Sequence, residues 1–467
     1  MTNKLLDKDI ICTFAASSEI KISMIESFTI KNYMSYRDTT ELSFVASKKD
    51  GGKAKELPPI WYKEINGKRL LRMLLCVGLN GTGKSKMFSA LKYMRMIATA
   101  KPSKPSDKPE YRPFLLDDYS FTRPTELTLI YYINEVCFNY YIKISSERIE
   151  EEELKIVQPK TVRVYHRSHN KELDKVVIKY GSGCDLSKSD QHDLEVNTLS
   201  NSSVLSTFGS LNLESTILTN NYDFFENHIS FVRRSDKSLA DKLQTGDPSR
   251  DKIMKKLLLR LLKDVGTNIS DYVVDEASLD ISELKANGAP DIVIKAMMEQ
   301  YPSGTITHKN LRFIHSTKEG KKELDSDLES LGTINIIRLL VVLYDVVIGK
   351  KSTCIDEIEY GIHTKALAFI LKMYLTIADE CQIMVATHDL SLLNVDFLRR
   401  DAVRLFEKDE YGSTNVRRRD YLHNTINFYR TYEREVDPRL DELMYKIEMF
   451  IKYKNDIDKY IKQLNIQ

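Results

Sequence analysis

Eight consecutive residues have the types and spacing of a phosphate-binding loop. Gly78-Leu79-Asn80-Gly81-Thr82-Gly83-Lys84-Ser85 matches GxxxxGK(S/T) and lies between an apolar run and a helical pattern. The glycines allow successive backbone N–H groups to point at phosphate oxygens, and the helix adds positive potential at its N-terminus. Lys84 would reach the β- and γ-phosphates, and Ser85 would ligate Mg²⁺. The sequence therefore predicts a nucleoside triphosphate site that includes Asn80, Gly81, Thr82, Gly83, Lys84 and Ser85.

A pair of carboxylates follows a short apolar strand much later in the chain. Thr353 to Ile355 predicts the end of a buried strand, and Asp356 and Glu357 come directly after it. Asp356 would hold Mg²⁺ through water, and Glu357 would polarise the water that attacks the γ-phosphate. Two carboxylates that only cap a strand end are the alternative. Asp356 lies 272 residues after Lys84, which favours a split ATPase head over an AAA+ module or a small kinase.

A histidine ends the next predicted strand. Gln382 to Ala386 is apolar after its first residue, and Thr387-His388-Asp389 follows it. At the same sheet edge as the carboxylates, His388 would contact the γ-phosphate and take part in catalysis. A purely structural histidine is the alternative, because a lone histidine at a strand end usually has no ligand.

A second anion site is indicated where an apolar helix begins. Ser330, Gly332 and Thr333 stand at the start of that helix, and Ser330 precedes Asp356 by 26 residues. The Ser330 hydroxyl and the N–H groups of Gly332 and Thr333 would clamp a phosphate at the helix N-terminus. The alternative is that Ser330 is only a helix N-cap.

These four motifs, in this order, resemble those of the ABC-type ATPase heads of the RecF, RecN, SMC and OLD lineage. More closely, they resemble bacterial AAA-family ATP-binding proteins of abortive-infection and anti-phage operons. The most specific features are Glu329-Ser330-Leu-Gly332-Thr333, as a shortened signature motif, and Asp356-Glu357-Ile-Glu359-Tyr-Gly-Ile-His363, as the Walker B motif and its loop. The resemblance covers roughly residues 24 to 412.

The resemblance implies a mechanism that requires two subunits. The ligands would be ATP and Mg²⁺, held by the Walker A motif (Gly78 to Ser85) and by Asp356. Two heads would sandwich two ATP molecules, with Ser330 and Gly332 reaching the γ-phosphate bound by the other subunit. Hydrolysis would therefore be slow and coupled to assembly. The chain departs from the family pattern at the Q-loop, whose glutamine has no clear match (Gln158, after the hairpin, is one candidate), and at Ile362, where leucine is usual.

The elements that must position these motifs predict an α/β fold. We expect an ABC-type P-loop ATPase head with a β-hairpin sheet around Asn134-Glu135, an inserted helical subdomain, and a buried strand from Leu70 to Val77 before the phosphate loop. Ser330 lies 246 residues after Lys84, and the chain between them lacks sustained heptads, so no long coiled coil is expected. The predicted divisions are an N-terminal arm (1–23), an N-terminal lobe with Walker A and an antiparallel β subdomain (24–185), an inserted helical subdomain (186–300), a C-terminal lobe with signature, Walker B and switch histidine (301–412), and a C-terminal basic stretch with an amphipathic helix (413–467).

Composition limits the class of protein and its location. The 467 residues carry a formal charge of only +2, with 42% hydrophobic and 29% charged residues, as in ordinary globular proteins. The longest strongly apolar run, Leu339 to Ile348, is broken by Asp345 and is far shorter than the roughly 20 residues that span a bilayer. The six cysteines form no CxxC pair. We therefore expect a cytoplasmic protein without membrane contact.

Two functions from different classes are consistent with these motifs. The first is a sensor and regulatory scaffold of an anti-phage defence system, which would respond to a phage protein or nucleic acid and control a separately encoded toxic effector, a nuclease. The second is a RecF-like DNA-repair ATPase that clamps DNA when its heads dimerise. Only 79 residues follow His388, too few for another α/β enzyme domain. Basic clusters that could contact nucleic acid are Arg233-Arg234, Lys252 to Lys263, and Arg417 to Arg419.

Overall fold

The computed structural model describes residues 22–47, 59–102, 104, 106–170, 172, 175–232, 239–286 and 288–418. The predicted N-terminal arm, except for its last two residues, lies outside this part of the chain. So do Arg233-Arg234, Arg419 and the predicted C-terminal amphipathic helix.

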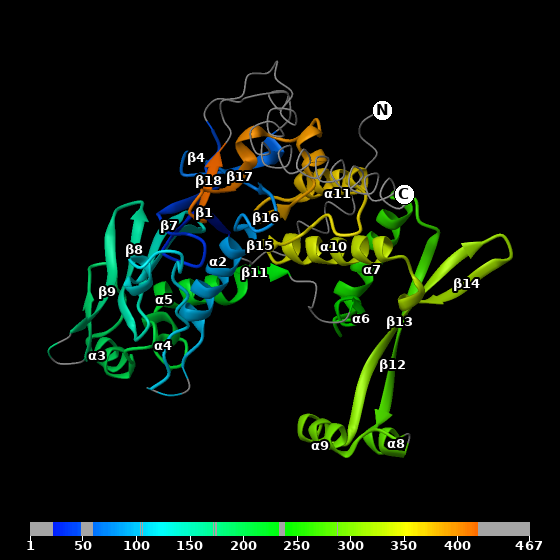
Figure 1. Cartoon of the computed structure of the whole chain (residues 1–467), viewed down its shortest axis with the longest axis horizontal. Coiled ribbons are helices and arrows are strands. Elements are labelled where there is room, and N and C mark those ends of the chain that lie inside the picture. The colour runs from blue at the N-terminus through cyan, green and yellow to red at the C-terminus, as the bar shows by residue number, and fades with distance from the viewer. Residues whose placement is uncertain are drawn as a thin grey trace, which may run out of the picture.

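A six-stranded sheet forms the centre of the head (Figure 1). Its order is β11-β15-β16-β5-β17-β18, and every neighbouring pair is parallel except β17 and β18. The strands are β5 (Met73–Val77), β11 (Ile229–Val232), β15 (Ser352–Ile355), β16 (Gln382–Thr387), β17 (Val403–Lys408) and β18 (Thr414–Arg418). β5, β15 and β16 are buried throughout, as is typical of inner strands of a parallel sheet; β5 is wholly apolar, whereas β15 begins with Ser352 and Thr353 and β16 with Gln382.

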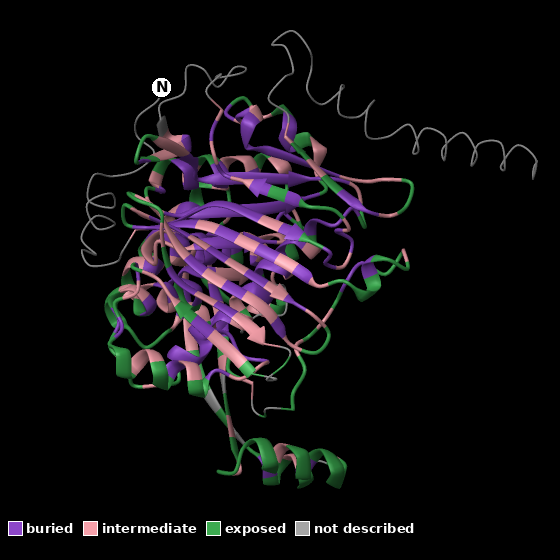
Figure 2. Cartoon of the chain, turned by 90° about the vertical axis from the view of Figure 1, so that its left-hand side faces the viewer, coloured by how far each residue is buried: buried purple, intermediate pink, exposed green. Residues whose placement is uncertain are grey.

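A seven-stranded antiparallel sheet lies beside this core, with the order β10-β9-β8-β7-β6-β1-β2. Its strands are β1 (Ser23–Lys31), β2 (Thr40–Ser43), β6 (Thr125–Ile133), β7 (Val136–Ile144), β8 (Ile149–Gln158), β9 (Val162–Asn170) and β10 (Lys175–Tyr180). The predicted hairpin is confirmed: β6 and β7 pair around Asn134, whose φ of 54° suits the turn. Figure 2 shows this sheet with buried and partly exposed residues alternating along its strands.

We predicted one strand from Leu70 to Val77, but the structure has parts of two strands there. β4 (Lys68–Leu71) pairs with β3 (Tyr62–Ile65) in a separate hairpin, and β5 begins only at Met73. Between them, the Arg72 guanidinium donates to the Ile60 carbonyl at 3.0 Å and to Asp379 at 3.1 Å. The break falls at Arg72, the one charged residue of the run, whose side chain is buried among these partners.

The described chain has ten α-helices. They are α2 (Lys84–Thr99), α3 (Lys188–Asn197), α4 (Val204–Phe208), α5 (Thr216–Asp223), α6 (Leu239–Leu243), α7 (Pro248–Asp264), α8 (Ile281–Ala286), α9 (Asp291–Gln300), α10 (Leu331–Ile348) and α11 (Thr364–Ile377). α2 contacts β1, β11 and α4, whereas α10 contacts α6, α7 and α11. The predicted α/β ATPase-head fold is confirmed, and the residues that the structure describes contain no long coiled coil.

An arm of three strands projects from the head in both views (Figures 1 and 2). It consists of β12 (Ile269–Asp280), β13 (Thr305–Thr317) and β14 (Gly320–Asp325), with α8 and α9 at its far end. We expected residues 186–300 to be a helical insertion, but the segment also contains strands. It contains β11, a strand of the central sheet, and β12, the first strand of the arm. Because β12 pairs with β13, the arm extends across the predicted boundary at residue 300.

Helix α10 is the one helix of the described chain that is long and apolar enough to cross a membrane, by length and composition alone. Nine of its residues are buried within the fold, and it packs against α7 and α11. Arg250 of α7 pairs with Asp345 of α10 at 2.5 Å. The apolar sequence of α10 is thus accounted for by its place in the core.

The two large sheets are joined by the buried side chain of Gln382, the first residue of β16. Its Oε1 accepts from Ile25 N at 2.6 Å and from Ser352 Oγ at 3.1 Å, and its Nε2 donates to the carbonyls of Ile25 and Leu71, both at 3.0 Å. A bulge in the pairing of β1 with β6, between Ile25 and Ser27, accompanies this contact.

We expect Gln382→Leu to lower the free energy of unfolding by about 3 kcal/mol, because it leaves several buried backbone groups without partners. Urea unfolding followed by circular dichroism measures this loss. Gln300→Leu, at an exposed position on α9, is the matched control and should change stability by no more than about 0.5 kcal/mol. Equal effects of the two variants would contradict the proposed link between the sheets.

Candidate nucleotide site

The phosphate loop lies between β5 and α2, as predicted. Gly81 and Gly83 have φ values of 79° and 108°, which side chains rarely adopt. A Cβ atom on Gly78 would lie 2.5 Å from the carbonyl oxygen of Phe406 in β17. Glycine is therefore required at these positions by backbone conformation and by a close neighbouring strand.

Lys84 begins α2 and points back into the loop. Its Nζ donates to the carbonyls of Gly78 at 2.7 Å and Leu79 at 3.0 Å. Burial, opposed by the nearby carboxylate of Asp356, lowers the pKa of Lys84 to about 8. The amine is thus confined at the loop and shielded from water, where its charge acts strongly on a bound phosphate.

His388 joins the switch strand to the phosphate loop. Its Nδ1 lies 3.2 Å from Lys84 Nζ and 3.1 Å from the Gly78 carbonyl oxygen. The backbone N–H of His388 donates to Glu359 Oε1 at 2.7 Å. β16 therefore places His388 at the loop, and the carboxylate of Glu359 holds its main chain.

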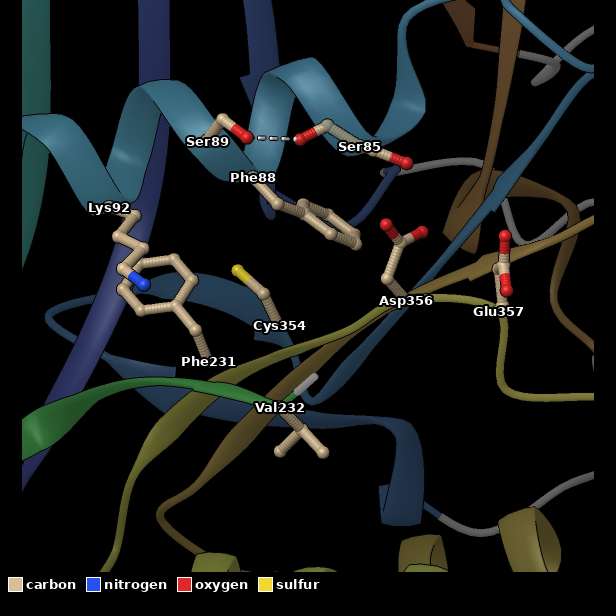
Figure 3. A pocket seen from close by; sticks show the side chains of 9 residues that line it. All are labelled: Ser85, Phe88, Ser89, Lys92, Phe231, Val232, Cys354, Asp356 and Glu357. Carbon is tan, nitrogen blue, oxygen red and sulfur yellow. Dashed lines mark hydrogen bonds between the residues drawn. The ribbon is translucent and has the colours of Figure 1, made fainter. Parts of the chain in front are cut away.

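The carboxylates of Asp356 and Glu357 stand beside the same loop. They line a cavity of about 300 Å³ together with Ser85, and Figure 3 shows the Ser85 hydroxyl and the Asp356 carboxylate turned toward one another. Ser85 is the second residue of α2, and Asp356 follows β15. Glu357 has a φ of 50°, a rare conformation for a non-glycine residue, which marks the sharp turn after the strand.

The donor set fits Mg²⁺. A serine hydroxyl and a carboxylate are hard oxygen ligands, and Mg²⁺ in phosphate sites is usually bound by one or two protein groups, with phosphate oxygens and water completing the octahedron. Ser85 and Asp356 would supply these protein groups. Among the described residues, no cluster of three or more histidine, cysteine, aspartate or glutamate side chains offers a competing metal site.

The predicted signature residues lie beside the loop that follows Walker B. Ser330 is the N-cap of α10, and its Oγ accepts from Thr333 N at 3.0 Å. A Cβ on Gly332 would lie 2.8 Å from the Gly361 carbonyl oxygen, and Asn335 Nδ2 donates to the Tyr360 carbonyl at 3.0 Å. The N-cap alternative is therefore correct as local structure, whereas a phosphate contact by Ser330 stays a prediction.

Gln158 does not reach the site. It ends β8 in the antiparallel sheet, where its Oε1 accepts from the Tyr132 hydroxyl at 3.2 Å. The strand that runs parallel to β15 at its outer edge is β11, and Phe231 and Val232 at its end line the same cavity as Asp356 and Glu357.

Several residues that no sequence motif predicted hold the phosphate loop in place. The Tyr36 hydroxyl donates to the Gly83 carbonyl at 2.9 Å, and Thr414 Oγ1 donates to the Thr82 carbonyl at 2.9 Å and contacts Ser35 Oγ at 2.8 Å. Tyr36 and Ser35 follow β1, and Thr414 begins β18, beyond the predicted limit of the C-terminal lobe at residue 412. These residues are far from Lys84 in the sequence, so no local pattern predicts their contacts with the phosphate loop.

The fold was compared with solved structures. An SMC head domain from Thermotoga maritima has a TM-score of 0.37 and 11% identity, and the match covers 85% of this chain and 99% of that one. An SMC head bound to the C-terminal winged-helix domain of ScpA has the same score and identity, covering 84% and 96%. An SMC head with an extended coiled coil, bound to the C-terminal domain of Pyrococcus furiosus ScpA, has a TM-score of 0.33 and 11% identity, covering 85% and 96%.

No curated protein matches this chain. A protein-family model matches residues 77–394, about two thirds of the chain, from the last residue of β5 to beyond the switch histidine. The predicted relation to AAA proteins of abortive infection is thereby confirmed, and the chain belongs to the family described as "AAA domain, putative AbiEii toxin, Type IV TA system".

Proposed function

We propose that this protein binds and hydrolyses ATP, and that hydrolysis requires a second copy of the chain. The observation that carries this proposal is the division of the site. Lys84, Asp356, Glu357 and His388 converge at one loop, whereas Ser330 and Gly332 contact Thr333 and the Gly361 region instead. A phosphate bound by Lys84 would meet the signature of another subunit.

Each residue has a chemical role in this proposal. Lys84 and the loop amides bind the phosphates, and Ser85 and Asp356 hold the metal ion, which would neutralise charge on the β- and γ-oxygens when bound. Glu357 orients the attacking water and accepts its proton. His388 is close enough to the loop to donate to a γ-phosphate oxygen. Ser330 of the partner subunit would complete the site with its hydroxyl.

Exposed apolar side chains around the signature support a second copy as the partner. Leu328, Leu331 and Tyr360 are 70%, 51% and 42% exposed, and they surround the N-terminus of α10. Neighbouring apolar side chains of this size on a surface often mark a contact with another protein. Ser330 lies on the same face. Closure of two heads would therefore cover the apolar side chains and at the same time complete the site.

Mixing two inactive variants tests the shared site. Lys84→Ala lacks the phosphate-binding amine, and Ser330→Arg blocks the signature, so each variant alone should hydrolyse almost no ATP. A heterodimer of the two contains one site with both motifs intact. An equal mixture should therefore recover about a quarter of the wild-type rate, measured as phosphate release. Mixing two batches of Lys84→Ala is the control, and absence of recovery in the heterologous mixture would refute a site shared between subunits.

For the biological role, we propose a regulatory scaffold of a cytoplasmic anti-phage system that controls a separately encoded effector, a nuclease. The family description names a toxin–antitoxin setting, which supports a partner gene product. Phage protein or nucleic acid would be the trigger. A toxin or nuclease gene beside this one, and loss of plaque reduction with Lys84→Ala, would support defence; a recombination gene cluster and sensitivity to DNA damage would support the repair alternative.

Three of the basic residues considered for nucleic-acid contact are paired within the protein, which weakens the DNA-clamp alternative at those positions. Arg417 pairs with Glu407, and Arg418 donates to the Val45 carbonyl at 2.7 Å and approaches Asp401 at 4.0 Å. On α7, Lys255 pairs with Asp271 at 2.7 Å. Guanidinium and ammonium groups that are already paired within the protein are weaker candidates for phosphate contacts than solvated ones.

A further inference from the structure

The base of the arm lies next to the signature motif. Asn268 immediately precedes β12, and His315 lies on β13, opposite Ile269 of β12 and Lys322 of β14. A single 3-10 turn, Ser326–Leu328, connects β14 to Glu329 and Ser330. The arm thus leads directly into the N-terminus of α10 along the chain and also meets it in space.

His315 bridges the arm and the signature through its two ring nitrogens. Nδ1 lies 2.9 Å from Asn268 Oδ1, and Nε2 lies 2.6 Å from Glu329 Oε1. The side chains of His315 and Glu329 are only 14% and 8% exposed. His315 Nε2 thus approaches the Glu329 carboxylate closely without a linear hydrogen bond.

Glu329 transmits this contact to the signature serine. Its other oxygen, Oε2, accepts from the backbone N–H of Ser330 at 3.2 Å. The carboxylate also stands at the N-terminus of α10, where negative charge is favoured by the helix dipole. If His315 is removed, Glu329 loses the partner that fixes its orientation, and Ser330 loses a rigid anchor for its main chain.

A series of contacts connects the start of α10, at Ser330, to the nucleotide site. Gly332 abuts the Gly361 carbonyl, and Asn335 donates to the Tyr360 carbonyl, so the start of α10 is tied to the loop after Walker B. In that loop, Glu359 holds the backbone of His388, whose ring lies 3.2 Å from Lys84 Nζ. The base of the arm is therefore connected to the phosphate loop by side chains and close backbone contacts.

We propose that His315 is a positioning residue for the signature motif and that it thereby sets how tightly two heads close on ATP. It holds Glu329, and through it Ser330, in the orientation that a second head requires. The arm would thereby influence head closure, because any displacement of β13 at its base moves the imidazole that fixes Glu329. This inference rests on the proposed ATP-dependent dimer.

The test measures dimerisation of nucleotide-bound heads. In a Glu357→Gln background, which retains ATP, the dimer dissociation constant is measured by mass photometry with ATP and Mg²⁺. His315→Ala should weaken the dimer about tenfold, whereas His315→Gln, whose amide N–H can donate to Glu329, should recover most of it. Binding of a fluorescent ATP analogue to the monomer should not change. Lys322→Ala, the exposed cross-strand neighbour of His315, is the matched control and should dimerise normally.

A double-mutant cycle separates positioning from general destabilisation. If His315 acts through Glu329, the double variant His315→Ala/Glu329→Ala should dimerise no more weakly than the weaker single variant. Additive losses, or normal dimerisation of His315→Ala, would overturn the inference while the Glu357→Gln parent still dimerises. Failure of the parent itself to dimerise with ATP would instead overturn the proposed function, and this inference with it.

Discussion

Replacing Lys84 with alanine is expected to weaken ATP binding by about a hundredfold. Removal of one partner from a buried, charge-assisted contact costs about 2–5 kcal/mol, and each 1.4 kcal/mol is a factor of ten in affinity. Lys84 is the one residue of the loop whose side chain brings a positive charge to the phosphates. Titration calorimetry with ATP and Mg²⁺ measures the change. Lys372→Ala, at an exposed position on α11, is the control and should bind as the wild type does.

The pH profile gives a second readout of the same side chain. Burial lowers the pKa of Lys84 to about 8, so the free protein loses this charge as the pH rises through 8. ATP binding should therefore be about tenfold weaker at pH 9 than at pH 7 in the wild type. The Lys84→Ala variant should show no such decline. Equal declines in both proteins would assign the effect to another group, and unchanged affinity of Lys84→Ala at pH 7 would refute the site.

Glu357→Gln is expected to reduce ATP hydrolysis by about a thousandfold while leaving ATP binding intact. The amide can still contact the water but cannot accept its proton, and general-base catalysis contributes about 10²–10⁴-fold. Because bound ATP is no longer consumed, the closed state should accumulate. Size-exclusion chromatography with light scattering should then detect a dimer or higher assembly with ATP, which the ADP-bound wild type does not form.

The control for Glu357→Gln is Glu319→Gln, the same substitution in the exposed turn between β13 and β14. It should hydrolyse ATP at the wild-type rate and leave the ATP-bound assembly short-lived. Rapid hydrolysis by Glu357→Gln would remove the residue from the catalytic role. Slow hydrolysis without an ATP-dependent assembly would keep the catalytic role and refute the dimeric mechanism.

The position of each chemical motif along the chain follows from residue types and their local pattern. Gly78 to Ser85 required a strand before it and a helix after it, and β5 and α2 lie there. Asp356 and His388 follow buried strands for the same reason: apolar runs in a parallel sheet end where its carboxyl edge meets solvent. These are local constraints of backbone conformation, charge and hydrophobicity, so they can be read without knowledge of the remaining fold.

Only the tertiary structure decided which motifs share a site. It joined His388 to Lys84 across 304 residues and placed Ser330 beside Gly361. It also divided Leu70 to Val77 at Arg72 and brought Thr414, Gln382 and His315 into contacts that no spacing predicts. These contacts depend on strand order, register and close approach between distant segments. The type of a residue limits what its side chain can bind, whereas the packing of the chain decides which partner that side chain contacts.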